Sequence, residues 1–129
     1  MPDRNTYDYA VIRLVPRVER QEFINIGIIL YCRALDYLDV IIDFDLHRLK
    51  YFAPDADTIM INEQLKGISM ICSEAQDAGY FDRFSKSERF QWLVSPSSTI
   101  IQTSPVHNGI SDNLTNTLKE LYEFFVLPS

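Results

Sequence analysis

The chain is poor in the residues and patterns that mark common catalytic and metal-binding sites. Its 129 residues include 2 cysteines, 2 histidines and 4 glycines. Cys32 and Cys72 lie far apart without the Cys/His spacing of a zinc site, so free buried thiols, no metal and no cofactor are expected. The sequence has no glycine-rich phosphate loop, no kinase signature and no G-x-S-x-G nucleophile elbow. These absences favour a non-enzymatic protein over an enzyme.

An excess of basic residues and a long hydrophobic run are also missing. The 12 basic and 18 acidic residues give a net charge of −6, which disfavours nucleic acid or an anionic membrane as a partner, because such binding rests on clustered Lys and Arg. The longest apolar run, residues 26–32, is too short to cross a bilayer, and charged residues precede any apolar run, so no signal peptide is expected. A single cytoplasmic domain over residues 1–129 is predicted.

Alternating hydrophobicity predicts three strands, at residues 7–15, 23–32 and 37–44. The loops between them are short, which favours antiparallel pairing. The even-numbered positions of the second strand are all apolar, which predicts a buried face. The opposite face of the sheet is expected to be partly polar and to carry Arg13, Asn25, Tyr31, Asp39 and Asp43.

Helical spacing follows the three strands. A short helix is predicted from Asp45 to Ala53, a longer one capped by Asp55 over residues 56–76, and a last one capped by Asp112. Residues 87–94 are predicted to form a helical turn that starts at Ser87, and residues 98–103 a fourth strand. The order βββααβα predicts an α+β fold, with an antiparallel sheet of about four strands and helices packed on one face.

The first candidate region is the charged turn after the first strand. Arg17 and Arg20 suit bidentate contacts to phosphate or carboxylate, or form a solvated hairpin tip whose charges neutralise one another. Arg13 lies mid-strand and is expected either to pair across the sheet with Asp39 or Asp43 or to bind an anion. Gly27 is expected to allow close approach, by the strand at 99–103 or by an aromatic ring.

The second candidate region is residues 87–109, which combine Arg, Trp, hydroxyl, Pro and His side chains in irregular chain. Trp92 is expected in the core beside Phe90 and Leu93, with an interface anchor as the alternative. A Ser/His hydrolase around His107 lacks an orienting group and an oxyanion hole. Asn108-Gly109 is expected to be a turn.

These two regions resemble the domain-of-unknown-function 3037 family of small bacterial proteins. The resemblance rests on Tyr9–Arg20, Phe23–Cys32, Ser87–Leu93 and Pro96–Gly109, and it extends over nearly the whole chain. It implies no established activity, cofactor or catalytic residue. Such proteins are often encoded beside a HipA-like kinase, which implies a protein partner in a toxin–antitoxin or stress-response setting.

Three hypotheses follow from the sequence. The first is a non-enzymatic binding module that acts with a partner such as that kinase, through a surface of nine residues: Arg13, Arg17, Arg20, Asn25, Arg89, Trp92, Ser98, Gln102 and His107. The second is a ligand binder or enzyme whose anion pocket is formed by Arg13, Arg89 and His107. The third is a homodimer built on strand edges and an apolar patch of Tyr31, Tyr37 and Ile41.

Overall fold

A computed structural model describes residues 4–16, 22–52, 54–73, 83–95 and 100–127. Its strands form one antiparallel sheet, in which β3 (Tyr37–Ile42) pairs with β2 (Ile24–Cys32) and β2 pairs with β1 (Asn5–Leu14). The other side of β1 pairs with both β4 (Ile101–Thr103) and β5 (His107–Ser111). The predicted α+β class is confirmed, and the sheet has one strand more than expected.

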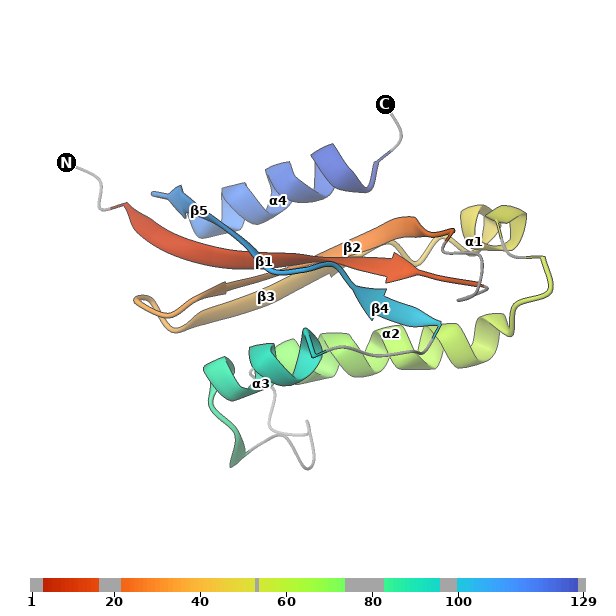
Figure 1. The fold of residues 1–129 in the computed structure, drawn as a ribbon, viewed down its shortest axis with the longest axis horizontal. Coiled ribbons are helices and arrows are strands. Elements are labelled where there is room, and N and C mark those ends of the chain that lie inside the picture. Colours follow the sequence, from red (N-terminus) through yellow and green to blue (C-terminus); the bar gives the residue numbers. More distant parts are fainter. Residues whose placement is uncertain (1–3, 17–21, 53, 74–82, 96–99, 128–129) are drawn as a thin grey trace.

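The helices lie on both faces of this sheet (Figure 1). On one face lie α2 (Thr58–Cys72) and α3 (Lys86–Leu93), and on the other lies α4 (Leu114–Phe125), while α1 (Leu46–Phe52) follows β3 at one end. The expectation that helices pack on one face was therefore wrong. The physical reason is that β1 and β2 are apolar on both faces, so each face needs a cover.

The sheet consequently separates two hydrophobic cores. The core under α2 and α3 includes Ile12, Leu14, Ile29, Ile61 and Leu65. The core under α4 includes Val11, Ile28, Leu30, Cys32 and Leu118. Tyr31, which was expected on a polar face, lies in the first core and stacks on Phe90 with ring centroids 5.2 Å apart.

A β-bulge at Ile26 changes which side chains of β2 face each core. The pairing of β1 with β2 steps from Ile12 opposite Gly27 to Arg13 opposite Asn25, which leaves Ile26 without a partner residue in the register. Before the bulge Ile24 and Ile26 face the α2 side, and after it Ile28 faces the α4 side. The even-numbered residues of β2 therefore share one face only within each half of the strand. They face the α2 side before the bulge and the α4 side after it.

Helix α1 begins directly after its predicted cap, Asp45, and the starts of the other three helices differ from the predicted ones by one or two residues. The side chains of the true N-cap residues each accept a hydrogen bond from the third residue of their helix, and Ser85 and Glu88 form a full capping box. Each correction replaces one good capping residue by a neighbouring one: Asp57 for Asp55, Ser85 for Ser87 and Asn113 for Asp112.

The segment expected to turn at Asn108-Gly109 is strand β5 instead. Ser104, between β4 and β5, holds this part of the chain against β1 through two hydrogen bonds to Val11. Its backbone N donates to the Val11 oxygen, and its Oγ accepts from the Val11 N, both at 2.8 Å. Both strands run antiparallel to β1, so Ser104 bridges the break between them without leaving the backbone of Val11 unpaired.

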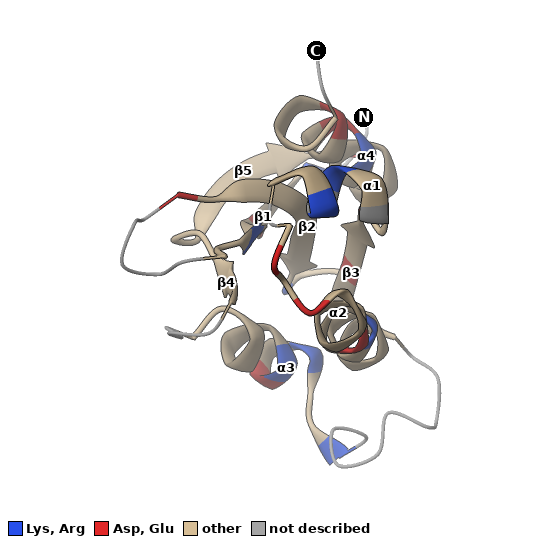
Figure 2. Cartoon of the chain, turned by 90° about the vertical axis from the view of Figure 1, so that its right-hand side faces the viewer, with Lys and Arg blue, Asp and Glu red and all other residues tan. Residues whose placement is uncertain are grey.

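Basic and acidic side chains are interspersed over the described elements rather than separated by sign (Figure 2). Within the described ranges, no helix combines the length and the apolar character needed to cross a membrane.

Candidate functional site

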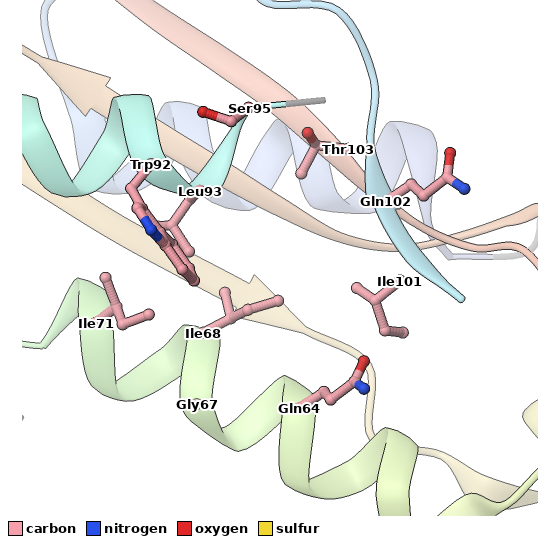
Figure 3. A pocket seen from close by; sticks show the side chains of 10 residues that line it. All are labelled: Gln64, Gly67, Ile68, Ile71, Trp92, Leu93, Ser95, Ile101, Gln102 and Thr103. Atoms are coloured by element: carbon pink, nitrogen blue, oxygen red, sulfur yellow. The ribbon is translucent and has the colours of Figure 1, made fainter. Parts of the chain in front are cut away.

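A pocket of about 570 Å³ opens between α2, α3 and β4 (Figure 3). Its apolar walls come from Ile68 and Ile71 of α2, Leu93 of α3 and Ile101 of β4. Leu93 and Ile71 are buried and belong to the core under α2 and α3. The pocket is therefore a place where this core opens to the surface.

Trp92 stands at the mouth of the pocket. Its indole points from α3 toward Ile68 and Ile71 (Figure 3), yet 59% of the residue is exposed. The expectation that Trp92 lies in the core was wrong, because its helix neighbours Phe90 and Leu93 occupy the buried face and leave Trp92 beside it. The alternative role as an interface anchor fits this position.

Polar but uncharged groups complete the lining. Gln64 and Gly67 come from α2, Ser95 follows α3, and Gln102 and Thr103 belong to β4. The amide of Gln102 points away from Ile101 (Figure 3), as alternation along a strand requires. None of the described lining residues carries a charge, although 23% of the chain is charged. The pocket is thus suited to an uncharged, mainly apolar group.

Sequence reasoning found two of the lining residues, Trp92 and Gln102, and missed the contribution of α2. One signal was available: Gly67 interrupts an otherwise good amphipathic helix. A Cβ on Gly67 would meet no atom within 4 Å, so no steric constraint in the fold requires glycine there.

Arg89 lies in the structure's interior and not in an anion pocket. Its guanidinium donates to the carbonyl oxygens of Ile71, Ser73 and Phe84 at 2.9, 3.0 and 3.1 Å. It thereby ties the end of α2 to the start of α3. Because Arg13 and His107 lie on β1 and β5, away from these bonds, the predicted pocket of Arg13, Arg89 and His107 does not form.

Arg13 and Asn25 do come together, opposite each other on β1 and β2. Gln102 lies opposite Arg13 on its other side. The predicted ion pair of Arg13 with Asp39 or Asp43 is absent from the described contacts, since Asp43 binds Arg48 at 3.2 Å and Asp39 lies opposite Leu30. Arg13 instead stacks its guanidinium 4.2 Å above the Phe23 ring.

The remaining candidates are scattered or undescribed. His107 is exposed on β5, where its ring lies 5.6 Å from that of Tyr9. Arg17, Arg20 and Ser98 lie outside the described residues. The dimer patch of Tyr31, Tyr37 and Ile41 is not formed, because Tyr31 lies in one core while Tyr37 and Ile41 pack against the other.

The described residues offer no assembled catalytic group. They contain no cluster of three or more metal-ligating side chains. The Ser104 hydroxyl is buried, accepts from Val11 and donates to the Pro105 oxygen, so it is fully engaged in the fold.

The Cys72 thiol is expected to be unreactive in the folded protein. Burial raises its pKa to about 12, so near pH 8 it stays protonated, and the thiolate is the reactive species. In a Cys32→Ala variant, labelling of Cys72 by a thiol reagent at about pH 8 should be slow and should accelerate when denaturant opens the fold. Labelling as fast as that of an unfolded peptide would contradict this.

Comparisons with known proteins agree with the resemblance seen in the sequence. A family model described as "Protein of unknown function (DUF3037)" matches residues 9–126. Neither the curated proteins nor the solved structures contain a match to this chain. The family match begins within β1, runs past the end of α4 and includes every described residue that lines the pocket. The chain therefore belongs to the DUF3037 family.

Proposed function

We propose that this protein is a non-enzymatic binding module that receives an apolar side chain of a partner protein in the pocket between α2, α3 and β4. The observation that carries the proposal is the exposed Trp92 at the mouth of an uncharged pocket continuous with the core. Tryptophan is enriched among the residues that dominate binding energy at protein interfaces. An apolar pocket that is already formed lowers the ordering cost of accepting a side chain.

The composition of the rim supports a protein partner over a charged metabolite. Gln64, Ser95 and Thr103 provide neutral hydrogen-bonding groups around an apolar centre, which is the usual plan of a protein interface. The family resemblance makes a HipA-like kinase in the bacterial cytoplasm the first partner to test, in a toxin–antitoxin or stress-response setting.

Substitution of Gly67 provides a matched test of the pocket. Gly67→Leu should fill it and weaken partner binding by at least tenfold, whereas Gly67→Ala should bind as the wild type does. Both variants should fold, because a Cβ at this position meets no atom within 4 Å. The alanine variant should also gain about 0.5–1 kcal/mol in unfolding free energy, since glycine disfavours helix. Binding to the kinase is measured by isothermal titration calorimetry, and complex formation by size-exclusion chromatography with light scattering.

Trp92→Ala provides the second arm of this experiment. Loss of an interface anchor of this type weakens binding by roughly 30-fold or more. Tyr51→Ala is the control, since Tyr51 is 93% exposed on α1 and does not line the pocket. Equal affinities of Gly67→Leu, Trp92→Ala and wild type for the kinase would overturn the pocket as the docking site. Absence of any complex with the wild type would remove the kinase as its partner.

A further inference from the structure

Two buried polar atoms face the same side of the sheet without a hydrogen-bond partner. They are Nε of Arg13, a donor, and Oδ1 of Asn25, an acceptor. The two residues lie directly opposite each other on β1 and β2, next to the bulge at Ile26. Buried polar atoms without a partner are rare in folded proteins, so this pair calls for an explanation.

The surroundings hold both groups in place. The guanidinium of Arg13 lies 4.2 Å above the ring of Phe23, which covers one of its faces. The amide nitrogen of Asn25 donates to the carbonyl oxygen of Phe125, at the end of α4, over 3.1 Å. This bond fixes the amide orientation, because a flip would set Oδ1 against another oxygen. Asn25 therefore presents an acceptor where Arg13 presents a donor.

The charge of Arg13 is also left without a counter-ion among the described contacts. Arg48 is paired with Asp43, and Arg89 donates to three carbonyl oxygens. The described contacts of Arg13 are the neutral Phe23 ring and its strand neighbours Asn25 and Gln102, in a chain with 18 acidic residues. Both Arg13 and Asn25 remain partly exposed, while Nε and Oδ1 themselves are covered, so a ligand would reach these two atoms after the side chains over them move aside.

We propose that Arg13 and Asn25 form a binding site for a small oxyanion that carries its own hydrogen-bond donor. The guanidinium would bind the anionic oxygens through Nε and one terminal nitrogen, as it binds carboxylate and phosphate elsewhere. The donor of the ligand would bind Oδ1 of Asn25. Hydrogen phosphate has both features in one group, the charge on its P–O⁻ oxygens and the donor in its P–OH, and a carboxylate with a neighbouring amide N–H has them in two groups.

The site is separate from the pocket proposed for the partner. Asn25 is bonded to the end of α4, on the opposite face of the sheet from α2 and α3. Gln102 lies opposite Arg13 and also borders the pocket, so it lies between the two sites. Binding of a small anion can therefore be measured without any partner protein.

Two pairs of ligands test the proposal directly, because in each pair one ligand has a hydrogen-bond donor and the other has none. At about pH 7, phosphate should bind at least tenfold more tightly than sulfate, which has a similar shape and no proton to donate. N-acetylglycine should likewise exceed acetate, and comparison of the two stronger ligands tells phosphate from carboxylate. Binding is followed by nuclear magnetic resonance titration of the wild-type protein, in which the Asn25 side-chain amide signals should shift.

Variants assign the binding to the residues named. Arg13→Gln should abolish the titration and Arg13→Lys should weaken it at least fivefold, because lysine keeps the charge and loses the fork. Arg48→Gln is the matched control and should bind normally, since its arginine is already paired with Asp43. If Arg13→Gln fails to fold, the wild-type titration and Arg13→Lys still decide. No binding by the wild type at millimolar phosphate and N-acetylglycine, or equal affinity for sulfate and phosphate together with acetate and N-acetylglycine, would overturn the proposal.

Discussion

Replacement of Arg89 by methionine is expected to lower the free energy of unfolding by about 3 kcal/mol, a loss large enough to threaten a domain of this size. The guanidinium donates to the carbonyl oxygens of Ile71, Ser73 and Phe84 at 3.1 Å or less. Methionine fills a similar volume, so packing changes little while these oxygens lose their donor. Arg89 also places a positive charge at the carboxyl end of α2, where the helix dipole favours it.

Arg89→Lys separates charge from hydrogen-bond geometry. Lysine keeps the positive charge but presents one nitrogen in place of a planar fork, so it cannot serve all three oxygens as arginine does. An intermediate loss of about 1–2 kcal/mol is expected. Urea unfolding followed by circular dichroism measures both variants, with the slope of free energy against urea serving as a check that the folded state is unchanged. A methionine variant within 0.5 kcal/mol of wild type would show that these bonds contribute little to stability.

Arg89 also shows why single residues of a site are hard to assign from sequence. An arginine near Trp92 in an irregular stretch has the composition of a binding surface, and part of this stretch lines the pocket between α2, α3 and β4. Whether its guanidinium points to solvent or to carbonyl oxygens depends on where α2 ends. That contact joins residues 18 positions apart and has no local signature.

The structure does bring together two other candidates from the sequence, Trp92 and Gln102. Both come from the segment whose composition suggested a site, and the structure places both at the same pocket, Trp92 on α3 and Gln102 on β4. The opposite wall could not be predicted, because α2 reaches the pocket only through the packing of two helices and an edge strand. The helical spacing of Ile61 and Leu65 identified a buried face correctly, but Ile68 and Ile71 at its border contribute to the core and to the pocket together.

The strands were predictable because alternation is a local property, and their faces were less so. The three predicted strands correspond to β1, β2 and β3. The bulge at Ile26 reverses the alternation of β2, and it depends on how β1 pairs with it. The second core could have been inferred, since Val11 alternates with Ile12 and Leu14 along β1 and is apolar as well. A strand apolar on both faces predicts a layer on each side.

Gly27→Ala is expected to destabilise the protein by about 3 kcal/mol, at the upper end of the cost of overpacking a core. A Cβ on Gly27 would lie 2.8 Å from the backbone oxygen of Ile41, 3.0 Å from Cδ1 of Ile12 and 3.2 Å from Cγ1 of Ile42. The close neighbour is thus β3, and not the strand at 99–103 or an aromatic ring as the sequence suggested. The Ile41 oxygen belongs to a paired strand and cannot move without disturbing the ladder of β2 and β3.

Gly67→Ala makes the same chemical change where the structure leaves room, and it should change stability in the opposite direction. Any general benefit of removing glycine, such as a less flexible unfolded chain, is present in both variants. The difference between their unfolding free energies therefore isolates the close contact at Gly27 and should be about 3–4 kcal/mol. Thermal and urea unfolding of the two variants measure it. If Gly27→Ala were as stable as wild type, β3 would have to lie farther from β2 than the pairing of Gly27 with Ile42 allows.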